Sequence, residues 1–241
     1  MEEPCIRVEK LTKSFAGRTV VDGLSFSVRK GEVFALLGHN GAGKSTTIDL
    51  ILGLKSPDSG FAKILGVDAA KNRKRVFEQV GVQLQHTEYQ SSITVEEACI
   101  EYASLYKAPA DDRKLLSDFG ISEFRNSFVS KLSGGERQKL SVILALIGNP
   151  KIVFLDELTT GLDVVARREV WRTLKQLKKQ GLTIFLTTHY MEEAEALCDR
   201  VCIMKAGRKV VEGSIDEVVA ASGQMNLEEA YLYFMGEEEL L

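Results

Sequence analysis

Residues 33–54 read VFALLGHNGAGKSTTIDLILGL, and this stretch decides the fold. The apolar run Val33 to Leu37 predicts a buried strand, and the periodic stretch Thr46 to Leu54 predicts a helix. Between them lies the spacing GxxxxGK[ST], whose glycines let backbone N–H groups approach a polyphosphate without an intervening Cβ. The start of the helix adds a partial positive charge. Together these features predict a phosphate-binding loop, and therefore nucleotide binding.

The side chains of this loop suggest separate roles. Lys44 is long enough to reach the β- and γ-phosphates, and the Ser45 hydroxyl is placed to bind Mg²⁺. The full set of candidate loop residues is Gly38, His39, Asn40, Gly41, Ala42, Gly43, Lys44, Ser45 and Thr46.

Composition sets limits on the class of protein. The 241 residues are 44% apolar and 27% charged, which is typical of a globular protein with a full core. The net charge of −3 argues against a nucleic-acid binder that works through bulk charge. Apolar runs are too short to span a membrane, and the first ten residues lack the pattern of a secretion signal. The four scattered cysteines suggest buried free thiols in a reducing cytoplasm, rather than a disulfide or metal site.

The order of predicted elements indicates an α/β protein. Alternation at 6–9 and 19–28 predicts an antiparallel sheet at the N-terminus. Strands alternate with helices on both sides of an all-helical stretch, 86–149, which we therefore read as an insertion in a parallel sheet. The further strands are expected at 61–67, 80–85, 152–155 and 183–187, with a closing hairpin at 201–204 and 208–212. The further helices are expected at 71–79, 94–107, 111–120, 136–148, 164–180, 190–198 and 227–235. Thr94 and Glu97 form a predicted capping box.

Three polar residues follow buried strands downstream of the loop. Asp156 ends an apolar strand and is placed as a second Mg²⁺ ligand, and the adjacent Glu157 is the candidate general base for water. His189 follows the strand Thr183–Thr188; a lone histidine is usually structural, but this position favours a γ-phosphate contact. Phe15, at the first turn, is either a packing residue or a platform for a base.

A second glycine-containing helix start follows at Leu132, Ser133, Gly134, Gly135 and Glu136. One reading is an ordinary serine-capped helix, and the other is a second anion site. Two such helix ends in a chain with one phosphate loop suggest a dimer, with each nucleotide held between two chains.

With these motifs in place, the chain resembles the ATP-binding subunit of ABC transporters along nearly its whole length. GHNGAGKST (38–46) resembles Walker A, IVFLDE (152–157) Walker B, and LSGGE (132–136) the family signature. The remaining matches are Gln85 to the Q-loop glutamine, His189 to the switch histidine, and TGLD (160–163), with Gly161, Leu162 and Asp163, to the D-loop.

The resemblance implies a fold and a set of roles. The fold is a P-loop NTPase (RecA-like) core with an N-terminal antiparallel β subdomain and an inserted α-helical subdomain. Residues 1–85 and 150–222 would form the core with its β subdomain, 86–149 the helical subdomain, and 223–241 a short tail. Phe15 would stack on adenine. Gln85 would have a catalytic role, joining the metal held by Ser45 and Asp156 to the water and to the helical insertion, which docks onto the membrane partner.

The resemblance also implies an activity and partners. ATP and Mg²⁺ are the expected cofactors, and ATP would drive head-to-tail dimerisation, with Ser133 and Gly135 of one chain contacting the γ-phosphate held by Lys44 of the other. Either a homodimer or a heterodimer with a paralogous ATPase would bind an integral-membrane permease. The protein would lie on the cytoplasmic face of the membrane, with no nucleic-acid partner.

Within the family, the chain is most similar to ATPase subunits of two-component exporters of drugs, antibiotics, lipids or polysaccharides. The segments that carry this similarity are 163–171, 189–201 and 226–236. An uptake system is the alternative, followed by a soluble ABC machine acting on DNA or ribosomes, and a phosphate-loop kinase.

The sequence departs from the family pattern at three positions. Leu158 replaces the proline that usually follows Walker B, which is expected to loosen the turn toward the D-loop. Lys139 and Leu144 replace arginines of the signature helix, which is expected to alter charge contacts at the dimer face. No catalytic group is missing, so a competent ATPase is expected.

Overall fold

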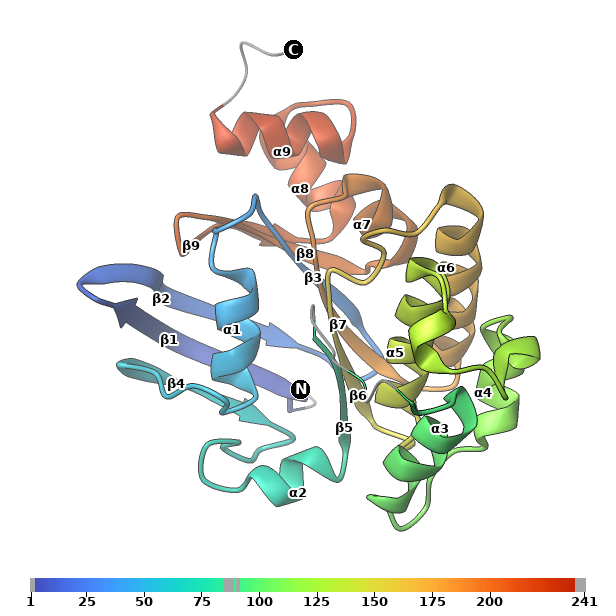
Figure 1. Ribbon diagram of the computed structural model, residues 1–241. Coiled ribbons are helices and arrows are strands. Elements are labelled where there is room, and N and C mark those ends of the chain that lie inside the picture. The colour runs from blue at the N-terminus through green and yellow to red at the C-terminus, as the bar shows by residue number, and fades with distance from the viewer. Residues whose placement is uncertain (1–2, 85–88, 90–91, 237–241) are drawn as a thin grey trace. The chain divides into compact units, whose positions relative to one another are not determined.

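The computed structural model describes residues 3–84, 89 and 92–236 (Figure 1). The chain forms two compact units, Met1–Val76 with Phe185–Leu241, and Phe77–Ile184. The strands are β1 (Ile6–Phe15), β2 (Arg18–Val28), β3 (Val33–Leu37), β4 (Ser59–Ile64), β5 (Val80–Gln83), β6 (Ile152–Asp156), β7 (Thr183–Thr188), β8 (Arg200–Lys205) and β9 (Arg208–Gly213). The helices are α1 (Lys44–Ile51), α2 (Arg73–Phe77), α3 (Val95–Ser104), α4 (Asp112–Asp118), α5 (Gly134–Leu146), α6 (Val164–Lys179), α7 (Met191–Leu197), α8 (Ile215–Ser222) and α9 (Leu227–Met235).

The first unit contains the predicted antiparallel sheet. Its strand order is β2-β1-β4, and β1 pairs antiparallel with both neighbours. Alternate side chains of β1, including Ile6 and Val8, are buried, which is the expected pattern for a sheet with one covered face. The N-terminal antiparallel β subdomain is therefore confirmed.

The phosphate-loop strand lies in the second sheet of this unit. There β3 lies between β8 and the Phe185–Thr188 part of β7, and β9 follows β8. The β3–β8 pair is parallel, and β8 and β9 form the predicted antiparallel hairpin. All five residues of β3 are buried, and the rings of Phe26, Phe34 and Phe185 stack with centroids 5.2–5.9 Å apart. This apolar packing fixes the strand that leads into the loop.

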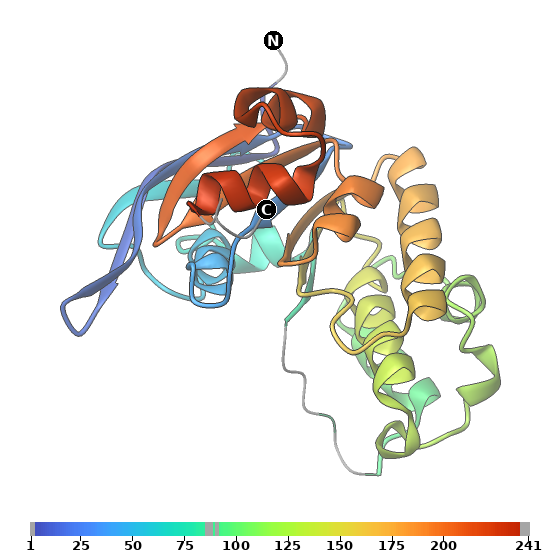
Figure 2. The ribbon, with the colours of Figure 1, turned by 90° about the horizontal axis from the view of Figure 1, so that it is seen from above.

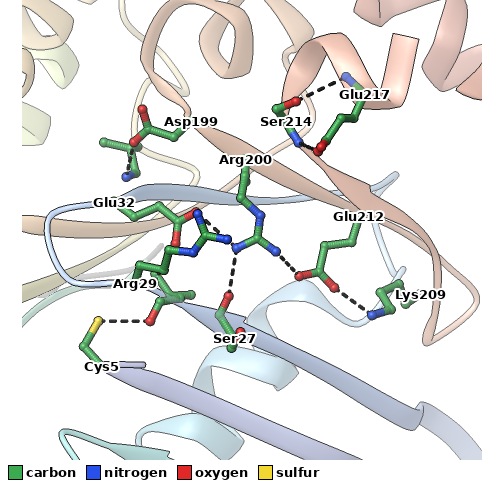
Figure 3. Close-up of polar contacts among 12 residues, drawn as sticks. Cys5, Ser27, Arg29, Glu32, Asp199, Arg200, Lys209, Glu212, Ser214 and Glu217 are labelled. Carbon is green, nitrogen blue, oxygen red and sulfur yellow. Dashed lines mark hydrogen bonds and ion pairs between the residues drawn. The ribbon is translucent and has the colours of Figure 1, made fainter. Parts of the chain in front are cut away.

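A polar network anchors the start of the same strand (Figure 3). The Asp199 carboxylate accepts a hydrogen bond of 2.9 Å from the Val33 N–H. Arg200 donates to the Ser27 carbonyl and to Glu32, and it also pairs with Glu212. Glu32 is only 6% exposed, so its charge needs these partners to offset the cost of desolvation. The network ties β2, β8 and β9 together at the edge where β3 begins.

The second unit combines the strands β5 and β6 with the helices α3, α4, α5 and α6 (Figure 2). β5 and β6 pair in parallel, from Val80 opposite Ile152 to Gln83 opposite Leu155. At Gly81 a Cβ would lie 1.8 Å from the Ala145 carbonyl oxygen of α5, so glycine alone allows the strand and helix to approach this closely. The predicted capping box of Thr94 and Glu97 is present at the start of α3.

One helix of the structure was not expected from the pattern of apolar residues. α8 begins with a complete capping box of Ser214 and Glu217, and this Ser-x-x-Glu spacing is a signal that the sequence does contain. The other differences are shifts of helix and strand ends. For example, α1 begins at Lys44 because the turn at Gly43 leads directly into helical geometry.

Candidate nucleotide site

Glycines shape the phosphate loop by close approach of the backbone. Gly41 and Gly43 have φ values of +83° and +103°, a region that residues with a Cβ rarely adopt. A Cβ on Gly38 would lie 2.8 Å from the Met204 carbonyl oxygen, and one on Gly43 would lie 2.5 Å from the Val20 carbonyl oxygen. The loop therefore needs glycine at these positions both for conformation and for space.

The helix that follows the loop begins without a side-chain cap. Its N-cap residue is Gly43, which has no side chain to accept a hydrogen bond from the first turn. Backbone N–H groups at the start of α1 are thus left for another acceptor, which is the arrangement that binds phosphate. Ser45, the second residue of the helix, is exposed and its hydroxyl is accessible.

Lys44 is buried within the phosphate loop, where it is expected to bind phosphate. Its side chain is 4% exposed, and Nζ donates to the Gly38 carbonyl at 2.7 Å and to the His39 carbonyl at 3.1 Å. The amine therefore holds the loop in its curved shape, and the same amine is the group that a bound phosphate would attract.

Phe15 lies at the end of β1 and is 40% exposed. The ammonium groups of Lys13 and Lys55 lie 5.5 and 5.6 Å from its centroid, within the range of cation–π attraction. Lys13 also pairs with Asp58 at 2.8 Å, and this hydrogen bond, with one from the Ser14 N–H, lowers the pKa of Asp58. The ring is accessible, so its predicted stacking on adenine remains open to test.

His189 follows β7, and β7 is the neighbour of β3 in the sheet. The phosphate loop and His189 therefore follow adjacent strands of one unit. The His189 ring is half-buried and lies 4.1 Å from the Tyr190 ring, centroid to centroid.

The two candidate acids belong to the second unit, at the end of β6. Asp156 is 3% exposed, and Glu157 is half-buried with φ +53°, an uncommon conformation for a residue with a side chain. The expected loosening at Leu158 is not observed. Its side chain is fully buried, and its carbonyl accepts a 2.8 Å hydrogen bond from Gln138.

The signature stretch, Leu132–Glu136, caps its own helix. Ser133 Oγ accepts from the Glu136 N–H at 3.3 Å, and the Glu136 carboxylate accepts from the Ser133 N–H at 2.7 Å. Gly134 and Gly135 are free of close backbone contacts; a Cβ on Gly135 would only touch Leu162 at 3.4 Å. The serine cap is thus present, and the other interpretation, a second anion site at Gly134 and Gly135, stays a prediction.

The expectation for Lys139 and Leu144 needs correction. Lys139 is 8% exposed, and its ammonium pairs with Glu169 of α6 at 2.8 Å, so its charge is neutralised inside the second unit. Leu144 is buried in the core at 3% exposure. Neither residue presents a charge at an exposed face.

The remaining predicted residues divide between the units. In the D-loop, Gly161 has φ +81°, Leu162 is buried, and Asp163 caps α6 by accepting from the Val165 and Ala166 N–H groups. Gln85 lies outside the described residues. Phe15, the phosphate loop and His189 thus belong to the first unit, and Asp156, Glu157, the signature and the D-loop to the second.

The cysteines and the helices agree with the expectations from composition. All four cysteines are free thiols, and Cys5, Cys99 and Cys202 are buried; burial raises the pKa of Cys99 to about 12. No helix in the described part of the chain is long and apolar enough to cross a lipid bilayer.

A parallel-strand core with an uncapped, glycine-bounded helix start defines a P-loop nucleotide-binding protein. Comparison with known proteins narrows the class. The family model described as "ABC transporter" matches residues 21–160. A shorter match, over residues 129–193, is to a model described as "AAA domain, putative AbiEii toxin, Type IV TA system".

Similar proteins carry transporter names. The chain is 39% identical over 226 residues to "Nod factor export ATP-binding protein I" of Paraburkholderia xenovorans, covering 92% of this chain and 74% of the relative. It is 40% identical to the protein of that name from Ralstonia nicotianae, covering 95% of this chain and 73% of the relative. A structure titled "Structure of ATP binding subunit of ABC transporter" aligns with a TM-score of 0.88 and 29% identity, over 96% of this chain and 99% of that one. The cbiO1 structure from Clostridium perfringens aligns with a TM-score of 0.79 and 29% identity, over 91% of this chain and 92% of that one.

The chain therefore belongs to the ABC transporter family and is an ATP-binding, ATP-hydrolysing subunit of that family. The P-loop NTPase fold expected from the sequence is confirmed.

Proposed function

We propose that this protein hydrolyses ATP in a site completed by a second ATPase chain, and that hydrolysis powers export through a separate membrane permease. One contrast between two helix starts carries the proposal. α1 begins at Lys44 without a side-chain cap, whereas α5 begins after Ser133 with glycines whose backbone is accessible. The first has the form of a phosphate cradle, and the second offers backbone to a nucleotide held by another chain.

The residues present fit a magnesium ion. Ser45, Asp156 and Gln85 offer a hydroxyl, a carboxylate and an amide oxygen, the hard oxygen donors that Mg²⁺ prefers. No group of three or more His, Cys, Asp or Glu side chains within the described ranges is arranged to hold a metal. This agrees with a Mg²⁺ bound largely by phosphate oxygens and water, which needs one or two carboxylates. When bound, the ion would neutralise charge that develops on the transferred phosphoryl group.

The chain's own residues would perform the other steps. Lys44 would exchange the Gly38 and His39 carbonyls for phosphate oxygens. Glu157 would take the proton of the attacking water, and His189 would hold the γ-phosphate. Phe15 would stack on the adenine. Ser133 and Gly135 would reach the γ-phosphate of the second chain.

The names of similar proteins support the proposed direction of transport and class of cargo. The similar proteins of Paraburkholderia and Ralstonia are named for the export of Nod factor, and this supports export of a drug, antibiotic, lipid or polysaccharide over uptake. The protein would be held at the cytoplasmic face of the membrane by its permease, as a homodimer or with a paralogous ATPase.

Glu157→Gln is the test of the site. It should leave ATP binding intact but slow hydrolysis by about a hundredfold or more, because a positioned base contributes that much. With ATP it should also accumulate a dimer in gel filtration. Glu123→Gln, at an exposed position of the same unit, is the matched control and should behave as wild type. A variant that turns over normally, or that stays monomeric with ATP, contradicts the proposed site.

A test of the direction of transport requires the permease as well as the ATPase. Inverted vesicles carrying the co-purified permease should take up cargo when ATP is added outside, since the ATPase side then faces the medium. Cargo leaving such vesicles on ATP addition would identify an uptake system instead.

A further inference from the structure

The backbone around Glu157 is held on both sides. Glu157 itself has φ +53°, in the left-handed region where a side chain is disfavoured. Such a conformation persists only where the surroundings enforce it. The residues before and after Glu157 are Asp156 and Leu158, and the carbonyl of each accepts a hydrogen bond from a glutamine side chain. The carbonyl of Glu157 itself accepts from the Thr160 N–H at 3.2 Å.

The stronger of these contacts comes from Gln138. Its Nε2 donates to the Leu158 carbonyl at 2.8 Å, a normal hydrogen-bond length. Gln138 lies on α5, which begins directly after Ser133, and the Leu158 side chain is fully buried. A helix therefore fixes the carbonyl of Leu158, the residue after Glu157.

The second contact comes from Gln83 at the end of β5. Gln83 is 2% exposed; its Nε2 donates to the Leu84 carbonyl at 2.9 Å and, over a longer distance of 3.4 Å, to the Asp156 carbonyl. The orientation of the amide is set by these two acceptors, since the opposite orientation would bring its oxygen against two carbonyls. Its Oε1 accepts no hydrogen bond from any residue in the described part of the chain.

We propose that Gln138 and Gln83 are positioning residues for ATP hydrolysis, which act by fixing the backbone of Glu157. The proposal rests on the function proposed above, in which Glu157 is the general base. Neither glutamine touches nucleotide in this assignment. Loss of either amide removes one of the contacts that hold this stretch, so the Glu157 backbone shifts and its carboxylate leaves the position from which it deprotonates water.

The proposal also connects two roles of one helix. In the proposed function, Ser133 at the start of α5 contacts the nucleotide of a second chain, and Gln138, five residues on, bonds the Leu158 carbonyl beside the base of its own chain. A partner nucleotide that moves the start of α5 would thus shift the Leu158 carbonyl.

The experiment compares Gln138→Met and Gln83→Met, which keep the side-chain length but remove the donor. Gln138→Met should lower kcat about tenfold, the effect of losing one buried hydrogen bond that positions a reacting group, with KM and the Kd for ATP unchanged. Gln83→Met should lower kcat by less, because its contact is longer. Gln138→Lys keeps a donor of similar reach and should restore most of the rate. Gln176→Met, on the exposed face of α6, is the matched control and should not change kcat.

A double variant that adds Gln138→Met to Glu157→Gln distinguishes a positioning role from general destabilisation of the fold. If Gln138 acts only through Glu157, adding Gln138→Met to Glu157→Gln should not lower the residual rate further. An additive loss, a normal kcat in Gln138→Met, or no recovery in Gln138→Lys overturns the proposal. If Gln138→Met does not fold, as judged by circular dichroism, Gln83→Met and Gln138→Lys carry the same comparison. Normal turnover in Glu157→Gln alone would instead refute the proposed function, whatever the glutamine variants do.

Discussion

The two glycine-containing helix starts of this chain differ in how their first turns are satisfied. α1, behind the phosphate loop, has glycine as its N-cap and no side-chain cap. α5, behind the signature stretch, has a complete capping box made by Ser133 and Glu136. The capping box satisfies the Ser133 and Glu136 N–H groups of α5, whereas no side chain caps the first turn of α1. The start of α1 is therefore the one suited to bind phosphate within its own chain.

The difference extends to the glycines themselves. Gly43 is locked by its φ of +103° and by the Val20 carbonyl, whereas Gly134 has no neighbour within 4 Å of a Cβ. Glycine in the phosphate loop is thus required by this chain's own fold. The chain's own fold does not require glycine in the signature stretch. The exposed backbone there is suited to contact another molecule.

Ser133→Arg should give the largest effect. A long cation at the start of α5 would block approach of a second chain's nucleotide, so hydrolysis should fall by about a hundredfold or more while ATP binding to the single chain stays unchanged. Equilibrium ATP binding and steady-state hydrolysis, measured on the same sample, provide the check. Equal loss of both would show that the signature acts within its own chain, and the comparison would fail.

Lys44→Ala should show the opposite pattern. Removal of a charge-assisted contact to phosphate should weaken ATP binding roughly 10- to 100-fold in the isolated chain. Isothermal titration calorimetry measures this directly. The variant also loses the bonds to the Gly38 and His39 carbonyls, so the thermal midpoint must be measured beside it. Undiminished affinity would refute the role given to Lys44.

A glycine-to-alanine pair sharpens the contrast in stability. Gly43→Ala places a Cβ 2.5 Å from a backbone carbonyl at positive φ, and should destabilise the fold by about 1–3 kcal/mol. Gly134→Ala meets open space in the first turn of α5 and should be neutral, or stabilising by about 0.4–1 kcal/mol. Urea unfolding monitored at Trp171 would measure both. Equal losses would remove the structural distinction between the two loops.

The smallest effect concerns the pH dependence of capped helices. Hydrogen bonds from the backbone and hydroxyl of Thr94 and Ser214 lower the pKa of Glu97 and Glu217 in the folded state. A lowered folded pKa means that the unfolded chain binds the proton more tightly, so this stabilisation is present above the unfolded pKa and is lost as pH falls through the folded value. Glu97→Gln and Glu217→Gln should each flatten the fall of the thermal midpoint between pH 6 and pH 3. An unchanged slope in both would show that these caps carry no pH-linked stability.

Local patterns in the sequence were sufficient to predict the elements that hold the candidate site residues of the first unit. GxxxxGK[ST] after a buried strand predicts the loop, because strand, turn and helix are encoded by adjacent residues. The capping boxes at Thr94 and Ser214 are encoded in the same local way, by a Ser/Thr-x-x-Glu spacing.

Contacts between distant residues could not be predicted in this way. The bond from Gln138 to the Leu158 carbonyl joins residues 20 apart, and that from Gln83 to Asp156 joins residues 73 apart. Lys139 illustrates the same limit: its position in the signature helix suggested an exposed charge, but α6 supplies Glu169 to neutralise it. These pairings form only when the chain folds, and no local spacing in the sequence predicts them.

The capping box at Ser133 has a consequence for the affinity of the proposed dimer. Ser133 Oγ uses a lone pair to accept from the Glu136 N–H, which leaves its hydroxyl proton as a donor. The bond also fixes the rotamer of the side chain before any partner arrives. A serine that is already immobile would lose little rotational entropy in the proposed closure of two chains over a nucleotide, so more of the contact energy would remain as affinity. The cap would thus preorganise the proposed interface as well as begin the helix.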